Sequence, residues 1–99
     1  MSAKKTDELS AHVARDVMVI NKLGIHARPA AMFVRIANQF KSDILVEKDG
    51  ETVNGKSIMG LMMLAAGPGS RIKVRAEGAD ASLAVNELES LVKRKFGED

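Results

Sequence analysis

The sequence predicts a small α+β domain of two layers, with helices on one face of a largely antiparallel four-stranded sheet. The chain has 99 residues, which is enough for one domain with a single core. Segments with the two-residue period of strands alternate with segments of helical period, in the order β-α-β-β-α-β-α. Because the predicted strands are short, an antiparallel α+β arrangement is the expected fold class.

The first predicted strand and helix follow each other directly. Residues 16–22, DVMVINK, are rich in strand-forming residues and are bounded by a Leu-Gly pair. From Ala27 onward, apolar residues recur at helical spacing, which predicts an amphipathic helix of about 14 residues. Pro29 is tolerated only in the first turn of a helix, so this helix is expected to begin within about two residues of His26.

The middle of the chain predicts a hairpin and a second helix. The segment SDILVEKDGETVN at 42–54 predicts two strands joined at Asp49-Gly50, a dipeptide typical of hairpin turns. The segment SIMGLMML at 57–64 predicts a short helix with Ser57 as its N-cap. A glycine inside this segment weakens the helix.

The last third of the chain predicts a strand and a long helix. In residues 70–78, apolar and basic side chains alternate, so Ile72, Val74 and Ala76 are expected to face the core and Arg71, Lys73 and Arg75 the solvent. Residues 79–96 predict an amphipathic helix with Ala84, Leu88, Leu91 and Val92 on its apolar face. The basic run 93–95 suits the last turn of that helix, where cations interact well with its dipole.

The first 14 residues show no firm periodicity beyond a helical turn around residues 9–13. We therefore expect an N-terminal extension at 1–14, followed by the folded domain at 15–99. His12 in this extension is expected to be a solvated side chain.

Composition excludes several classes of function. The sequence has no cysteine, which rules out disulfides, thiolate metal sites and cysteine nucleophiles. Its three aromatic residues are all phenylalanine and its net charge of +2 is spread over alternating signs, so a nucleic-acid partner is not expected. No apolar run approaches the roughly 20 residues of a membrane span, and the polar start of the chain predicts a cytoplasmic protein.

His26 is the candidate for chemistry. The free N–H groups of a helix start form an anion site, and the guanidinium of Arg28 suits phosphate oxygens. Histidine also forms covalent intermediates, so His26 could take a phosphoryl group at this position. In the alternative interpretation, His26 is only a helix cap and Arg28 only a solvated side chain. With two histidines in the chain, a zinc site has little support, and no metal or cofactor is expected.

Two segments resemble the histidine-containing phosphocarrier family, HPr, of the bacterial phosphoenolpyruvate:sugar phosphotransferase system. They are GIHARPAAMFVRIANQF at 24–40 and VNGKSIMGLMMLAAGPGS at 53–70. The resemblance implies the open-faced β-sandwich of this family, with three helices on one face of the sheet. It also implies that His26 is phosphorylated at Nδ1, with Arg28 and the N–H groups of Ala27 and Arg28 supporting the phosphoryl group.

The resemblance further implies partners and a regulatory site. Enzyme I would donate the phosphoryl group and a sugar-specific IIA domain would receive it, so the protein would be a carrier rather than a free-standing enzyme. Ser57 matches the serine that HPr kinase/phosphorylase modifies in many members, creating a docking surface for a transcriptional regulator. The partner-docking residues would be Ile58, Met59 and Met62, with positive charge from Arg35 and Lys56.

Two alternatives remain open at this point. A nitrogen-branch phosphocarrier of the same fold would use its phosphorylated state as a signal instead of feeding sugar uptake. A small α+β RNA-binding module would need a basic sheet face with aromatic residues. The predicted outer face supplies Arg71, Lys73 and Arg75 but no aromatic side chain, which disfavours the RNA-binding alternative.

Overall fold

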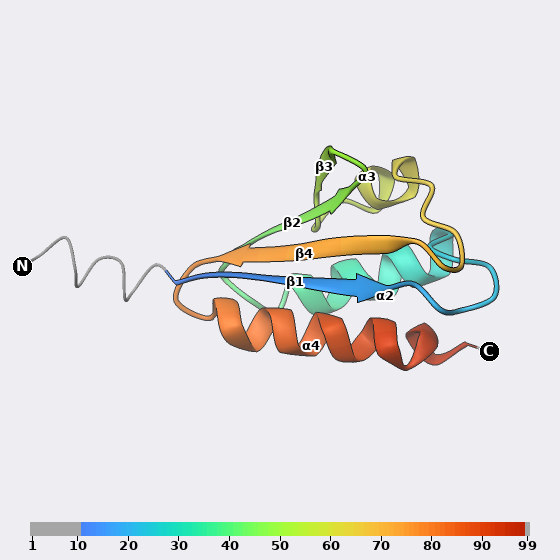
Figure 1. Cartoon of the computed structure of the whole chain (residues 1–99). Coiled ribbons are helices and arrows are strands. Elements are labelled where there is room, and N and C mark those ends of the chain that lie inside the picture. Colours follow the sequence, from blue (N-terminus) through green and yellow to red (C-terminus); the bar gives the residue numbers. More distant parts are fainter. Residues whose placement is uncertain (1–10, 99) are drawn as a thin grey trace, which may run out of the picture.

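The predicted order of strands and helices is confirmed. The structure is a computed structural model that describes residues 11–98 (Figure 1). Its elements are, in chain order, β1 (His12–Met18), α2 (Ala27–Ala37), β2 (Asp43–Lys48), β3 (Glu51–Asn54), α3 (Ile58–Met63), β4 (Arg71–Glu77), α4 (Ala81–Lys93) and the short 3-10 helix η1 (Lys95–Gly97).

The four strands form one antiparallel sheet in the order β1-β4-β2-β3. The central strand β4 pairs with β1 on one side, where Ile72 lies opposite Val17, and with β2 on the other, where Val74 lies opposite Val46. Figure 1 shows the strands side by side, with α2 behind them and α4 running along β1. The α+β fold class, with three helices on one face of the sheet, is therefore confirmed.

Strand β4 shows how the core is built. Its apolar residues Ile72, Val74 and Ala76 are buried as predicted, while Arg71 and Lys73 are exposed on the other face. The helices bury their apolar faces: Ala30, Phe33 and Ala37 from α2 and, as the sequence predicts, Ala84, Leu88, Leu91 and Val92 from α4. Hydrophobic burial on one face of the sheet thus holds the two layers together.

The first strand is displaced from its predicted position. It was expected at residues 16–22, but β1 covers His12–Met18 and pairs along its whole length with β4. Ala14 and Arg15 have little intrinsic strand preference, so pairing with β4 overrides the local signal. Strand β1 therefore includes residues 12–14, which the predicted boundary assigns to the extension, and it replaces the described part of the predicted turn around 9–13. Residues 1–10 of the predicted extension lie outside the described residues.

The last helix is shorter than the predicted 79–96. Helix α4 ends at Lys93, and Lys95 and Phe96 take positive φ angles of 59° and 55°. This left-handed backbone is uncommon for residues other than glycine. It turns the chain so that the Phe96 side chain is buried in the core and Glu98 points back toward α2. Of the basic run, only Lys93 lies in the last turn of α4.

Asp80, at the start of α4, ties that helix to the segment before β2. Its carboxylate accepts hydrogen bonds from the Ser42 hydroxyl and from the backbone N–H groups of Lys41 and Ser42. The bond from the Ser42 hydroxyl lowers the pKa of Asp80 most, the Lys41 N–H lowers it further, and burial opposes both. The ionised carboxylate therefore stabilises the folded state.

We expect Asp80→Asn to weaken the dependence of stability on acid pH. Because the pKa of Asp80 is lowered on folding, its contribution is present above the usual carboxyl pKa and is lost as pH falls through the folded value. Urea unfolding between about pH 5 and pH 2 should therefore show a smaller loss of stability in the variant. The control is Asp49→Asn at the exposed hairpin turn, and equal pH slopes in all three proteins would refute the prediction.

Candidate functional site

His26 lies at the start of α2, as Pro29 predicts. It is the N-cap residue, with extended backbone angles (φ −89°, ψ −166°), and its carbonyl accepts the first intrahelical bond from the N–H of Ala30 at 3.0 Å. Pro29 has no N–H, so the donors of the first turn without an intrahelical partner are the N–H groups of Ala27 and Arg28. Together with the positive end of the helix dipole, these two groups favour an anion beside His26.

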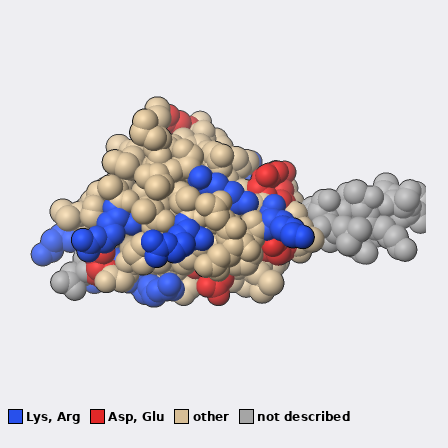
Figure 2. Space-filling view, turned by 180° about the vertical axis from the view of Figure 1, so that it is seen from behind, with Lys and Arg blue, Asp and Glu red and all other residues tan. Residues whose placement is uncertain are grey.

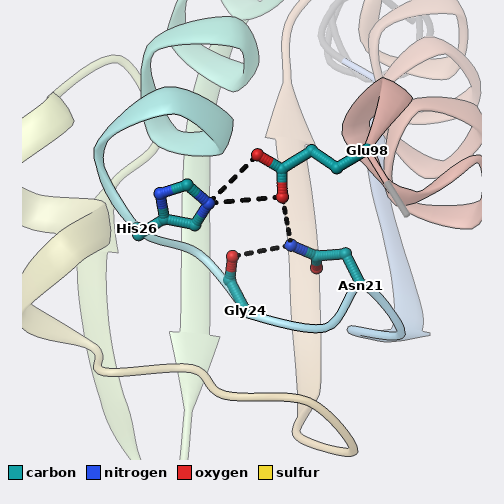
Figure 3. A network of polar contacts seen from close by, with 4 residues as sticks. All are labelled: Asn21, Gly24, His26 and Glu98. Carbon is teal, nitrogen blue, oxygen red and sulfur yellow. Dashed lines mark hydrogen bonds and ion pairs between the residues drawn. The ribbon is translucent and has the colours of Figure 1, made fainter.

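The imidazole ring of His26 is held by Glu98, which is 72 positions away in the sequence. The distances from Nε2 are 3.0 Å to Oε2 and 3.2 Å to Oε1 of Glu98. Within residues 11–98 the ring makes no capping hydrogen bond to α2. Figure 3 shows Nε2 turned toward the carboxylate and Nδ1 on the opposite side of the ring. The interpretation of His26 as a simple side-chain cap therefore does not fit the structure.

Asn21 connects this carboxylate to the loop before α2. The Asn21 side chain is completely buried, and its Nδ2 donates to the Gly24 carbonyl at 2.8 Å and to Oε1 of Glu98 at 3.0 Å (Figure 3). In the described part of the chain, its Oδ1 has no hydrogen-bond partner. One buried amide thus fixes both the loop and the carboxylate that contacts His26.

The environment of Glu98 decides which nitrogen of His26 carries the proton. Burial acts to raise the pKa of Glu98, but the hydrogen bonds from Asn21 and His26, with the positive charge of Arg28 nearby, lower it overall. An ionised carboxylate can only accept hydrogen bonds. Nε2 must therefore donate, and in the neutral ring the lone pair is left on Nδ1.

This arrangement can perform nucleophilic chemistry on an anionic group. The Nδ1 lone pair, the two N–H groups and the exposed guanidinium of Arg28 all belong to the first turn of α2 and its cap. A phosphoryl group bound to Nδ1 would meet hydrogen-bond donors and positive charge while staying accessible to solvent. The structure thus brings together His26, Ala27 and Arg28, the three residues that the sequence selects.

The family comparison agrees with this geometry. The sequence profile described as "PTS HPr component phosphorylation site" matches residues 13–94. The chain belongs to the HPr phosphocarrier family. The order of elements and the antiparallel sheet expected for this chain are the ones described above.

Relatives of known name match most of this HPr chain. The phosphocarrier protein HPr of Neisseria meningitidis is 49% identical over 84 residues, covering 85% of this chain and 94% of the relative. The HPr-like protein Crh of Bacillus subtilis is 47% identical, covering 84% and 98%. Among solved structures, HPr from Bacillus anthracis matches with a TM-score of 0.79 and 54% identity, covering 83% of this chain and 98% of that one.

Helix α3 carries the second group of candidate residues in this HPr domain. Ser57 is its N-cap as predicted, and its Oγ accepts a hydrogen bond from the Gly60 N–H at 3.0 Å. Leu61 and Leu64 are buried. The other side of the helix forms an exposed apolar patch, here called the α3 patch, made of Ile58, Met59, Met62 and Met63. Met59 is the most exposed of them, at 73%.

Basic side chains lie on the same side of the molecule as α2. Arg35 is exposed in the last turn of α2, whereas the Lys56 ammonium donates to the Phe40 carbonyl at 2.9 Å. Figure 2 shows lysine and arginine side chains spread across this face, beside a region that is mostly uncharged. Of the two basic side chains predicted to attract acidic partners, Arg35 is thus exposed to solvent, whereas Lys56 is hydrogen-bonded to the backbone just after α2.

Sequence reasoning missed Asn21 and Glu98. An asparagine a few residues before a glycine is a turn signal, because its side chain can bond to nearby backbone, so Asn21 could have been found as a loop residue. Nothing in the sequence places Glu98 beside His26.

In residues 11–98 the structure shows no cluster of three histidine or carboxylate side chains fit for a metal ion. Across the same residues, no helix is long and apolar enough to span a membrane.

Proposed function

We propose that this protein is a phosphocarrier that accepts a phosphoryl group on Nδ1 of His26 from phospho-enzyme I and passes it to a sugar-specific IIA domain in the cytoplasm. The observation that carries the proposal is the orientation of the ring: Nε2 contacts Glu98, while Nδ1, on the opposite side of the ring, has no hydrogen-bond partner among residues 11–98. Membership of the HPr family supports the same reaction.

The proposed transfer uses groups that already surround His26. The Nδ1 lone pair forms a bond to phosphorus, and the P–N bond to the donor histidine breaks, returning its electron pair to the donor ring. The N–H groups of Ala27 and Arg28, with the Arg28 guanidinium, stabilise the phosphoryl oxygens. Because these groups are at the surface, the phosphoryl group stays within reach of the next acceptor.

The α3 patch is the proposed docking surface for both partners. Ile58, Met59 and Met62 offer flexible apolar contacts that can adapt to more than one protein. The positive charge of Arg35 and Lys56 beside α2 would steer acidic surfaces toward His26.

The proposed function can be tested with purified components. Incubation with enzyme I and phosphoenolpyruvate should produce one phosphoryl adduct per chain that is labile in acid and stable in base. Addition of a IIA domain should then discharge the adduct onto that domain. If no competent enzyme I forms an adduct, or if the adduct is stable in acid, the proposal is wrong.

Ser57 is proposed as a regulatory site for an ATP-dependent HPr kinase/phosphorylase, with a transcriptional regulator as the reader of the modified form. Ser57 is the N-cap of α3 and borders the α3 patch. A phosphate there adds about −1.5 to −2 charge beside the docking residues. It would repel acidic partners of the patch and offer a new contact to another protein. A regulatory role is supported by one relative of solved structure, Crh of Bacillus subtilis, which is named a catabolite repression HPr.

We expect Ser57→Ala to abolish labelling by ATP and an HPr kinase while leaving phosphorylation by enzyme I intact. The variant also loses the N-cap bond to Gly60, so its unfolding free energy should fall by about 1 kcal/mol. Ser57→Asp keeps a good N-cap and serves as the folded control, measured by urea unfolding. Labelling that persists in Ser57→Ala would place the kinase site elsewhere.

A further inference from the structure

We propose that Glu98, held by Asn21, is a positioning residue that selects the reactive tautomer of His26 and balances the charge of its ring during transfer. This inference rests on the proposed function, because it assigns a task within the phosphoryl transfer at His26. It concerns Glu98, near the end of the described chain, and its two contacts near the start, Asn21 and His26, which it meets only in the folded structure.

The first argument is geometric. Both carboxylate oxygens of Glu98 lie within 3.2 Å of Nε2, and Oε1 also accepts from the buried amide of Asn21. The side chain of Glu98 is only 17% exposed, compared with 37% for the His26 side chain. The carboxylate is therefore less exposed than the ring and has a second, buried hydrogen-bond partner in Asn21.

The second argument concerns the tautomer. A neutral imidazole places its single proton on either nitrogen, and the nitrogen that carries the proton cannot attack. Of the two ring nitrogens, only Nε2 lies within hydrogen-bond distance of Glu98, so the carboxylate stabilises the form that carries the proton on Nε2 and the lone pair on Nδ1. Carboxylates that hold a histidine in one tautomer have this effect on catalytic and metal-binding histidines generally.

The third argument concerns charge during the reaction. When Nδ1 bonds to phosphorus, the proton stays on Nε2 and no other group accepts it, so the ring gains a positive charge. The Glu98 carboxylate, 3.0 Å from Nε2, faces that charge, while the phosphoryl group meets the N–H donors of α2 on the other side of the ring. The charge is lost again when the phosphoryl group leaves. Glu98 therefore stabilises the charged ring in both the forward and the return transfer.

The test compares Glu98→Gln, Glu98→Asp and Glu98→Ala with the unmodified protein. Glutamine keeps the shape but removes the charge, and aspartate keeps the charge at a greater distance. We expect kcat for transfer from phospho-enzyme I to fall roughly tenfold in Glu98→Gln and Glu98→Ala, with Glu98→Asp between them and the unmodified protein. KM for enzyme I should stay unchanged in all three. The nitrogen NMR shifts of the His26 ring should move toward the Nδ1–H form in Glu98→Gln and Glu98→Ala.

The control is Glu87→Gln, which removes the same charge from an exposed position of α4. Thermal unfolding of every variant separates loss of fold from loss of positioning. Unchanged kcat, or unchanged ring shifts, in both Glu98→Gln and Glu98→Ala would overturn the inference, and so would an effect confined to KM. Failure of the proposed function is distinguishable, because the unmodified protein would then accept no phosphoryl group at all.

Discussion

Replacing His26 with alanine is expected to abolish phosphorylation by enzyme I completely. The side chain supplies the only nucleophile of the proposed site, and neither Arg28 nor the N–H groups of α2 can replace its lone pair. The fold should survive, because the ring is partly exposed and its removal costs mainly one hydrogen bond to Glu98, about 1 kcal/mol. For a domain of this size such a loss lowers Tm by about 4–8 °C.

The matched control is His12→Ala, which removes the only other histidine of the chain. His12 lies in β1, is exposed and pairs with Glu77 at 2.9 Å, away from the start of α2. Autoradiography after incubation with enzyme I and labelled phosphoenolpyruvate should show a full signal for His12→Ala and none for His26→Ala. Retained label in a folded His26→Ala would refute the assignment of the site.

Gly24→Ala is expected to have the largest effect on stability of any substitution near the site. Gly24 has a φ of +70°, and a Cβ atom there would lie 2.4 Å from the carbonyl oxygen of Ala66 and 2.7 Å from Cα of Gly67. Both atoms belong to the backbone, so the two loops must separate. That movement would break the 2.9 Å bond from the Ile25 N–H to the Ala66 carbonyl and displace the carbonyl that Asn21 holds. We expect a loss of about 1–2 kcal/mol from backbone strain and about 1–3 kcal/mol more from the clash.

Gly50→Ala separates these two contributions. Gly50 has a similar φ of +83° in the β2–β3 turn, but no atom lies within 4 Å of the position that its Cβ would take. Urea unfolding should therefore show only the strain contribution for Gly50→Ala, together with normal phosphorylation. Equal losses of stability in the two variants would contradict the proposed clash between the loops.

Regular elements with strong periodicity could be predicted from the sequence. Alternation of apolar and basic residues located β4, and Pro29 located the start of α2. The position of β1 could not be predicted, because its ladder with β4 depends on residues far along the chain. Local preference alone favoured the more apolar residues 16–22 over the true strand.

The sequence predicted the part of the candidate site at the start of α2, but not the carboxylate that contacts the His26 ring. His26, Ala27 and Arg28 are adjacent in the sequence, so the chemistry of a helix start applies to them directly. Glu98 reaches the ring through a left-handed turn at Lys95 and Phe96, and neither residue type favours that conformation. Burial of Phe96 imposes the turn, and burial is a property of the whole fold rather than of the local sequence.

Phe96 also makes the state of the site depend on a local unfolding equilibrium. Opening of the last turn, η1, would expose the Phe96 side chain, which is 1% exposed in the closed form. Burial of such a side chain contributes about 1.5–3 kcal/mol, a factor of roughly ten to one hundred and fifty in favour of the closed form from this contact alone. In the opened form His26 would lose the carboxylate that contacts its ring, so hydrogen exchange at the amides of η1 should report the fraction of molecules in which Glu98 holds the ring.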